Sequence, residues 1–377
     1  MENMPKKYKY SIICCARWES NYIGEWLSYY KEIGFDHIYV YCNDDDPTEF
    51  FDRINEAGLP KGFLTVKYFP EKGKQHEMYL DALTVAREES EWISFFDIDE
   101  FLDLKSFANI SDYMNIQKGD VDCVYFNWLQ FKTSGFISRP YGSVLRNYVY
   151  RDKYLNNHTK YICKASYLTE ERIKKSNASL HHSFHHFLSK SGWPDIKIVN
   201  SLGDDWSEYA ENFPHTANHL LNNTDQALLL EAPHIKHYHL RSAEDLIIRY
   251  FRSIDGDFSG QKIYFQEFIE KNKDYSLIDK GEVFDDSLKK FAEKRKLFFH
   301  VPTRDEEKRI VIAETPLWKS EIVLDFSNNS VSHLEHNTKG KFSFHDQLLL
   351  VYWDEYPLEI FIKNGDVFKS SAMLSEK

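Results

Sequence analysis

Strand and helix patterns alternate over the first hundred residues of the chain, and this alternation restricts the possible folds more than any other feature. Stretches with helical periodicity separate four apolar, β-rich runs, at Tyr8–Cys15, His37–Tyr41, Leu64–Tyr68 and Trp92–Phe96. A helix between two strands allows them to lie parallel in one sheet, with the helix packed on a face of that sheet. We therefore expect an α/β fold with a mostly parallel sheet and helices on both of its faces.

The pattern changes further along the chain. Val144–Tyr150 is typical of a strand, and a helix is expected to begin at Ser242. The last part of the chain holds short strand candidates, and Asn364-Gly365 is a strong hairpin-turn signal. We therefore predict one domain over residues 1–300 and a small β-rich C-terminal module over residues 301–377.

The composition of the chain argues against several classes of function. Among 377 residues, 47 Lys and Arg stand against 59 Asp and Glu, and the formal net charge of −12 argues against binding to nucleic acid. No apolar run reaches the roughly 20 residues that span a bilayer, and the N-terminus lacks the apolar region of a signal peptide. The five cysteines form no CxxC pair, which is typical of a reduced compartment. We expect a cytoplasmic protein with at most peripheral association with the inner face of the membrane.

A group of carboxylates directly follows a buried strand candidate. Asp97, Asp99 and Glu100 come after Trp92–Phe96. Parallel α/β sheets bind ligands outside the carboxyl ends of their strands, and residues two apart on an extended backbone point the same way. Asp97 and Asp99 would repel each other, whereas a hard divalent cation would satisfy both and leave positions open for phosphate oxygens. We favour a metal site here over a solvated acidic loop, which is the alternative for D-x-D by itself.

Several motifs in order resemble one known family. Tyr10–Asn43 contains C-A-R-W-E-S-N-Y-I-G-E-W, which is similar to the C-A-K-x-E-x-x-Y-I-x-E-W opening of glycosyltransferases of the family 92 / family 2-like group. The resemblance continues at Gln75–Leu83, at Asp97–Phe101 (D-x-D-E-F), at Trp128–Gly135 and at His237–Ser242. It covers roughly residues 8–255 and leaves the C-terminal β-rich part outside. It implies a GT-A fold, which is a Rossmann-like, mostly parallel sheet.

The resemblance also implies roles for particular residues. Asp97 and Asp99 would hold Mn²⁺ or Mg²⁺ against the diphosphate of a UDP-sugar, and His237 would be a late third ligand, with His239 as the alternative. The residues that it implies at the nucleotide and the donor are Arg17, Glu19, Asn43, Asp44, Gln75 and Asp81.

An inverting glycosyl transfer needs a general base for the acceptor hydroxyl. Asp205 and Asp204 lie after the metal motif, and the adjacent Trp206 could stack on an acceptor sugar. A solvated acidic turn is the alternative interpretation of this pair, and Glu208 and Glu211 compete for the role.

A histidine cluster precedes these residues. His181 with His185, and His182 with His186, have the i, i+4 spacing of helical zinc ligands, but no Glu follows the first His as in H-E-x-x-H. We favour a cluster near the acceptor over a catalytic zinc site.

Together these features predict an enzyme of the EC 2.4 class, a metal-dependent, inverting glycosyltransferase. It would move a hexose such as galactose from a UDP-sugar to a saccharide or lipid-linked saccharide acceptor in cell-surface polysaccharide or lipopolysaccharide synthesis. Two alternatives stay open: a carbohydrate-binding or scaffold protein on a decayed transferase domain, and a metal-dependent nucleotide-sugar hydrolase. The intact Asp97, Asp99 and His237 argue against decay.

Overall fold

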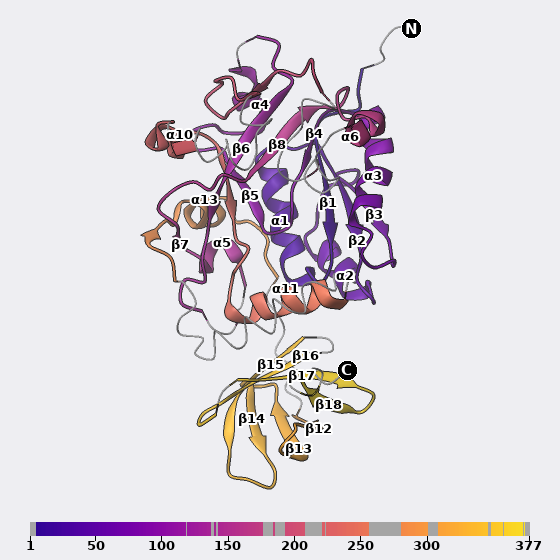
Figure 1. Cartoon of the computed structure of the whole chain (residues 1–377), viewed down its shortest axis with the longest axis vertical. Coiled ribbons are helices and arrows are strands. Elements are labelled where there is room, and N and C mark those ends of the chain that lie inside the picture. Colours follow the sequence, from indigo (N-terminus) through magenta and orange to yellow (C-terminus); the bar gives the residue numbers. More distant parts are fainter. Residues whose placement is uncertain are drawn as a thin grey trace. The chain divides into compact units, whose positions relative to one another are not determined.

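Figure 1 shows the computed structural model of the chain, which describes residues 5–117, 119–136, 139–140, 142–175, 184, 193–207, 221–222, 224–255, 280–300, 308–345, 348–356, 358–371 and 373. The chain forms two compact units. The first comprises Met1–Ser134, Gly142–His239 and Lys280–His300, and the second comprises Gly135–Tyr141, Leu240–Asp279 and Val301–Lys377. The second unit takes in stretches that precede residue 300, so a domain boundary at that point stays a prediction.

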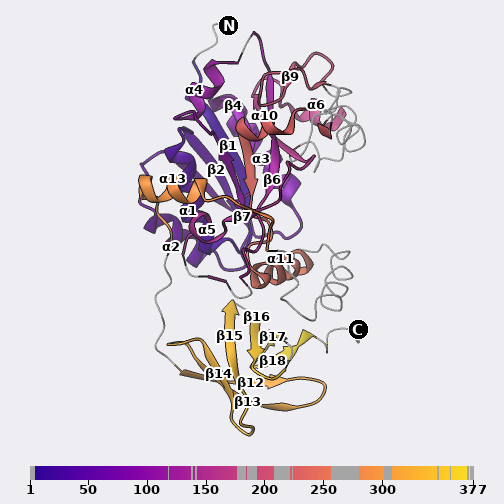
Figure 2. The same cartoon turned by 90° about the vertical axis from the view of Figure 1, so that its left-hand side faces the viewer.

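The first unit is built on a nine-stranded sheet in the order β3-β2-β1-β4-β8-β6-β10-β5, with β9 beside β6 (Figure 2). The strands β1 to β4 are mutually parallel, whereas β8 is antiparallel to both of its neighbours, β4 and β6. The strand bounds are β1 Tyr8–Ala16, β2 His37–Cys42, β3 Leu64–Tyr68, β4 Ser90–Phe95, β5 Glu100–Asp103, β6 Cys123–Gln130, β8 Thr159–Lys164, β9 Ile198–Val199 and β10 His234–His237. The predicted α/β class with a mostly parallel sheet is therefore confirmed.

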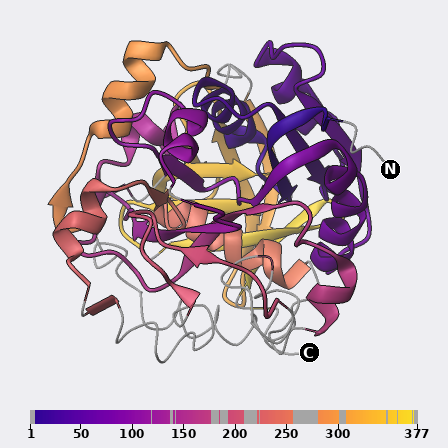
Figure 3. The same cartoon turned by 90° about the horizontal axis from the view of Figure 1, so that it is seen from above.

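Helices pack on both faces of this sheet, as predicted. The adjacent Phe95 and Phe96 point to opposite faces, because side chains alternate along extended backbone. Tyr79 of α3 packs on Phe95 with ring centroids 5.4 Å apart, and Tyr30 of α1 stacks on Phe96 at 5.5 Å. The helices of this unit are α1 Ser20–Glu32, α2 Thr48–Glu56, α3 Gln75–Glu89, α4 Ile110–Asn115, α5 Val144–Asn147, α6 Glu170–Lys175, α10 Gln226–Glu231 and α13 Ser287–Arg295, the last of which is orange in Figure 3.

The strand predicted over Val144–Tyr150 is wrong. Val144–Asn147 is the short helix α5, and only Tyr150–Arg151 is extended, as β7, which pairs with β11 (Val283–Phe284). The helix begins here because Ser143 caps it, accepting a hydrogen bond from the Arg146 N–H at 3.1 Å. The buried Glu25 of α1 then accepts from the Ser143 hydroxyl and from the Val144 N–H. A distant carboxylate therefore decides the conformation of an apolar segment that is locally ambiguous.

The second unit contains a helix and a closed barrel. The helix α11 (Ala243–Asp255) follows Ser242, as predicted, and Ser242 and Asp245 form a reciprocal capping box. Seven strands close the barrel because β18 returns to pair with β12 in parallel. Their bounds are β12 Lys308–Glu314, β13 Lys319–Asp325, β14 Ser330–His333, β15 Lys339–His345, β16 Leu348–Trp353, β17 Glu359–Asn364 and β18 Val367–Ser370.

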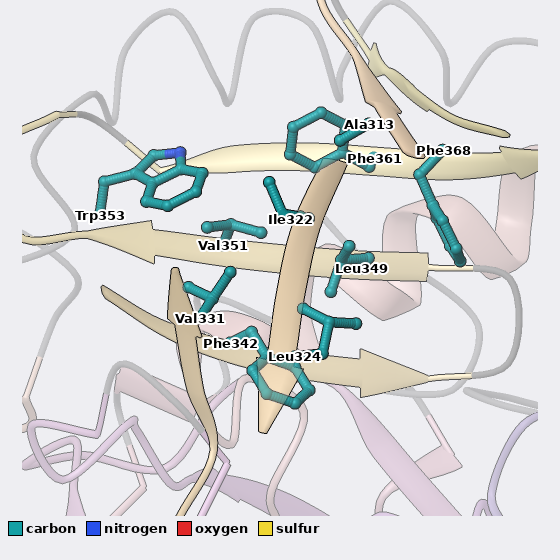
Figure 4. Packing of buried hydrophobic residues seen from close by; sticks show 10 residues of the cluster. All are labelled: Ala313, Ile322, Leu324, Val331, Phe342, Leu349, Val351, Trp353, Phe361 and Phe368. Carbon is teal, nitrogen blue, oxygen red and sulfur yellow. The ribbon is translucent and has the colours of Figure 1, made fainter. Parts of the chain in front are cut away.

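The barrel has a hydrophobic core of its own, which confirms the predicted β-rich module. Mostly aromatic and branched side chains from all seven of its strands form this core, and Figure 4 shows them packed together. The core residues are Ala313, Ile322, Leu324, Val331, Phe342, Leu349, Val351, Trp353, Phe361 and Phe368. Gly365 has φ 61° in the turn between β17 and β18, so the predicted Asn364-Gly365 hairpin is present.

Within the parts of the chain that the structure describes, every helix is too short or too polar to cross a lipid bilayer.

We predict that Glu25 makes the stability of the protein depend on pH. Burial raises the pKa of Glu25 from 4.5 to about 7, although the hydrogen bonds from Ser143 and Val144 oppose the rise. The unfolded chain therefore releases this proton at lower pH than the folded chain, so the free energy of unfolding falls as pH rises from about 4.5 to about 7. The loss amounts to about 3 kcal/mol.

Glu25→Gln cannot ionise, so its free energy of unfolding should fall less between pH 4.5 and 7.5 than that of the wild type. Urea denaturation at several pH values measures the difference. Glu49→Gln, on the exposed part of α2, is the matched control and should keep the wild-type slope. Equal slopes in wild type and Glu25→Gln would contradict the prediction.

Candidate active site

The carboxyl ends of β1 to β4 lie at one edge of the sheet because these strands are parallel. Asp97 and Asp99 follow β4, and a turn in which the Glu100 N–H donates to the Asp97 carbonyl at 3.0 Å leads into β5. β5 pairs with β10 so that Glu100 is opposite His237, and the Tyr238 N–H donates to the Asp99 carbonyl at 2.8 Å. This pairing brings a histidine from late in the sequence beside the carboxylates that follow β4.

Asp99 and His237 form the part of this edge that suits a metal ion. Their side chains are 10% and 6% exposed, and Oδ1 of Asp99 lies 3.5 Å from Nε2 of His237. Two atoms that each bind a cation at about 2.1 Å lie roughly 3.0–3.4 Å apart, so this spacing fits a shared ion, and the donor set suits Mn²⁺. Among the described residues, no group of three or more His, Cys, Asp or Glu is arranged to hold an ion.

Asp97 has different partners from Asp99. Its Oδ2 accepts a hydrogen bond from Nζ of Lys160 at 2.9 Å, and its Oδ1 accepts from the Tyr79 hydroxyl at 3.3 Å. Lys160 is on β8, and its side chain is completely buried. Its Nζ also lies 3.2 Å from Oε2 of Glu100. The structure thus brings both aspartates of the D-x-D motif to the end of β4 and pairs the first of them, Asp97, with a buried ammonium group.

Burial governs the protonation of this group. Burial raises the pKa of Glu100 well above its usual range; Lys160 opposes the rise, and Asp97 and Asp99 add to it. Burial by itself would lower the pKa of Lys160, but Asp97 and Glu100 raise that pKa above its usual value. The raised pKa of Lys160 favours its charged form.

Aromatic rings pack around His237. The indole of Trp128, on β6, lies 4.2 Å from the His237 ring between centroids, and His158 stacks on Trp128 at 5.1 Å. His239, the alternative ligand, lies 5.1 Å from His237 between ring centroids. These contacts restrict the orientation of the His237 imidazole, which a metal ligand requires.

Residues after β1 and β2 form a second polar group at the same edge. The Arg17 guanidinium donates to the Asn43 carbonyl and, at 2.9 Å, to Oδ2 of Asp45, while the Trp18 N–H donates to Oδ1 of Asp44. Burial raises the pKa of Asp44 to about 6, although Trp18 and Arg17 oppose the rise. Trp18 has φ 57°, a left-handed conformation that is rare for a bulky side chain and is typical of ligand sites.

The other residues that the family resemblance implies at the donor differ in their burial and in their partners. Glu19 is buried at the start of α1. Gln75 donates to the Tyr79 hydroxyl at 3.2 Å, which links it to the carboxylates. Asp81 instead accepts from Lys67 on β3 at 2.6 Å, and its side chain is 45% exposed. Gln75 is therefore linked through Tyr79 to Asp97, whereas Asp81 pairs with Lys67.

The structure does not bring Asp205 and Asp204 to the carboxylates. Asp205 bridges to β9, and β9 pairs with the first two residues of β6, whereas His237 lies beside Gln130, the last residue of β6. At about 3.3 Å per residue these two places are roughly 20 Å apart. Both aspartates are exposed, and Trp206 is buried. The pair lies in an exposed turn, and its role as general base stays a prediction.

Other parts of the prediction are outside the described residues, namely His181, His182, His185, His186, Glu208 and Glu211. Conversely, the sequence analysis missed Lys160, Tyr79 and the contacts of Glu100. A lysine inside the apolar strand run T-K-Y-I-C-K was the available signal, because a charge in a buried strand needs a partner.

Comparison with known proteins identifies the family of the chain. The model of the family "Glycosyltransferase family 92" matches residues 9–239, more than half of the chain. Family 92 proteins of Ricinus communis and Arabidopsis thaliana are both 24% identical to it, over 53% and 50% of the chain. The match spans only 35% and 33% of their own lengths, so the chain covers about a third of these relatives.

Solved structures are more distant. Glucosyl-3-phosphoglycerate synthase from Mycobacterium tuberculosis, in complex with Mn²⁺, UDP and glucosyl-3-phosphoglycerate, is 13% identical, with a TM-score of 0.29 over 59% of this chain and 78% of that chain. On the family match, the chain belongs to glycosyltransferase family 92. Family membership and the strand order together confirm the predicted GT-A-like fold.

We predict that Lys160→Met destabilises the protein by about 3–5 kcal/mol, because it leaves buried carboxyl groups without their cation. Lys164→Met, on the same strand, is the matched control. Lys164 is 34% exposed and pairs with Asp122 at 2.9 Å, so its loss should lower stability by less than about 1 kcal/mol. Urea denaturation measures the free energy of unfolding of both variants. Similar losses would show that the buried ion pair stabilises the protein no more than a surface pair does.

Proposed function

We propose that the chain is a metal-dependent, inverting glycosyltransferase that moves a hexosyl group, such as galactosyl, from a UDP-sugar to a saccharide or lipid-linked saccharide acceptor. The observation that carries this proposal is the Asp99–His237 pair, 3.5 Å apart at the carboxyl end of β4, in a member of family 92. Ligands of α/β sheets bind at this edge.

Asp99 and His237 would hold Mn²⁺ or Mg²⁺. The bound ion would neutralise the charge that develops on the departing diphosphate. The near-complete burial of both side chains keeps bulk water from competing for the same positions. Asp97, at the same strand end, would meet the donor beside the ion.

The nucleoside would lie against the residues that follow β1 and β2. The Arg17 guanidinium lies 5.1 Å over the Trp18 ring, so both planar groups are positioned to contact a base. The uracil N3–H is a donor, and the carboxylate of Asp44 is an acceptor of the type that recognises it. Asn43, whose amide donates to the Glu71 carbonyl at 2.9 Å, holds the loop after β3 beside this group.

The acceptor half of the reaction needs a base within reach of the attacking hydroxyl. Because Asp205 and Asp204 lie at the opposite end of β6, the proposal assigns the base to neither.

For the biological setting, we propose cell-surface polysaccharide or lipopolysaccharide synthesis at the inner face of the membrane. The five cysteines, all free, support a reduced compartment.

We predict that Asp99→Asn lowers the Mn²⁺-dependent affinity for UDP at least tenfold, because the amide removes a charged ligand. Isothermal titration of UDP with and without Mn²⁺ measures the change. Glu91→Gln, exposed near the opposite end of the same strand, is the matched control and should bind as the wild type does. Unchanged affinity in Asp99→Asn would remove the metal assignment.

His237→Ala should raise the Mn²⁺ concentration needed for half-maximal activity more than His239→Ala does. The reason is that Nε2 of His237 faces Asp99, while His239 is the next ring along. A Mn²⁺ titration of sugar transfer from UDP-galactose or UDP-glucose compares them. A shift in His239→Ala alone would move the ligand to His239. Release of free sugar at the same rate with and without saccharide acceptors would favour a hydrolase.

A further inference from the structure

Two cysteines lie directly opposite each other on neighbouring strands of the sheet. Cys123 of β6 is paired with Cys163 of β8, and these two strands are antiparallel. Directly paired residues point their side chains to the same face of a sheet, so both thiols lie on one face. Both residues are completely buried. The fold therefore brings together two thiols that are far apart in the sequence.

The backbone hydrogen bonds determine how closely the strands approach at this pair. The Lys164 N–H donates to the Asp122 carbonyl at 2.9 Å, so the neighbouring pair is a hydrogen-bonded one. The Cys123 N–H instead donates to the Lys197 carbonyl at 3.2 Å, on the other side of β6. Because the two kinds of pair alternate along antiparallel strands, Cys123 and Cys163 form a non-hydrogen-bonded pair. Cα atoms in such pairs are about 4.5 Å apart, within the range of about 4.4–6.8 Å that a disulfide bridges.

The two thiols are in contact with each other. Burial raises the pKa of the Cys123 thiol well above its usual range, and a hydrogen bond with the Cys163 thiol raises that pKa further. The Cys163 thiol donates to the Lys164 carbonyl at 3.6 Å. A buried, neutral thiol reacts slowly, because the thiolate is the nucleophile in disulfide formation. A bond between these sulfur atoms is therefore expected to form while the chain folds, before the sheet buries them.

The sheet gives the other three cysteines no comparable neighbour. Cys14 and Cys15 are adjacent on β1, so their side chains point to opposite faces. Cys42 of β2 is paired with Ala16, two residues along β1 from Cys14, which places the Cα atoms of Cys14 and Cys42 roughly 8 Å apart. The strand β4 lies between β1 and β8 and separates this group from Cys163. The strand register thus selects one pair among the five cysteines.

We propose that Cys123 and Cys163 form a disulfide when the chain folds under oxidising conditions and remain a pair of thiols in a reduced compartment. The bond would connect β6, which carries Trp128 beside His237, to β8, which carries Lys160. It would close a loop of about 40 residues, and such a cross-link stabilises a fold by restricting the unfolded chain. This inference is independent of the proposed transferase function.

Glutathione disulfide is an oxidant that balances the reaction. The thiolate of one cysteine attacks it, forms a mixed disulfide and releases one glutathione thiolate. The thiolate of the other cysteine then attacks the cysteine sulfur of the mixed disulfide and releases the second glutathione. The two cysteine thiols lose two protons and two electrons, which convert one glutathione disulfide into two glutathione molecules.

The test counts free thiols in the chain after production in bacteria with a reducing cytoplasm and in bacteria with an oxidising cytoplasm. Each sample is denatured and alkylated with N-ethylmaleimide, and its intact mass is measured. Because all five cysteines are free in the structure, we expect five adducts from the reducing host, but three from the oxidising host. Peptide mapping without reductant should recover the peptides of Cys123 and Cys163 as one cross-linked pair. Five adducts from both hosts, or a bond between other cysteines, would overturn the inference.

Two variants separate this pair from the other thiols. Cys123→Ala should keep its four remaining thiols free in the oxidising host. Cys14→Ala, which removes an equally buried cysteine from β1, is the matched control and should still lose two thiols. Loss of two thiols in Cys123→Ala would overturn the assignment.

Thermal unfolding tests the stabilising effect of the bond. Wild-type protein from the oxidising host should unfold at a temperature at least about 5 °C higher than wild-type protein from the reducing host. Cys123→Ala should unfold at the same temperature from either host. Equal temperatures for both wild-type samples, despite a bond seen by mass, would overturn the stabilising role. Should the oxidising host yield no soluble protein, wild-type protein from the reducing host is treated with glutathione disulfide in partly denaturing urea, and the same count of three adducts decides.

Discussion

The buried ammonium group of Lys160 balances a concentration of negative charge that the sheet could not otherwise accommodate. Asp97, Asp99 and Glu100 follow one another at the end of a buried strand, and Glu100 is completely buried. Burying an unpaired charge is costly, so such a motif requires a cation from elsewhere in the fold. β8 supplies it because it lies antiparallel to β4 and presents Lys160 to both Asp97 and Glu100. The order of strands in the sheet therefore also determines which charges meet at the site.

The same strand order assembles the rest of the site. β10 lies between β6 and β5, so His237 is held against the turn that carries Asp99, and Trp128 of β6 packs on its ring. Asp99 and Trp128, two neighbours of His237, thus come from separate parts of the sheet, the turn after β4 and the strand β6. The backbone positions of these residues are therefore fixed by strand pairing. Rigid positioning of ligands is what metal-assisted transfer chemistry needs.

The family match ends where the middle segment of the first unit ends, at residue 239. The barrel lies beyond it and has a hydrophobic core of its own. Conversely, Lys280–His300 returns to the first unit after the chain has contributed α11 to the second. The family match therefore covers the part of the chain that carries the site. The first compact unit extends beyond this match, because it also includes Lys280–His300.

Local sequence determined the features that depend on near neighbours. The alternating periodicities predicted the parallel strands, Ser242 marked the start of α11, and Asn364-Gly365 marked the last hairpin, because caps and turns are made by residues a few positions apart. The position of Asp97 and Asp99 after a buried strand likewise follows from local pattern. Tertiary structure decided what depends on distant partners. Glu25 made Val144–Asn147 helical, Lys160 paired with Asp97 and Glu100, and β9 placed Asp205 at the far end of β6. No periodicity within a segment encodes which distant strand will pair with it, since that choice is made by packing of the whole sheet.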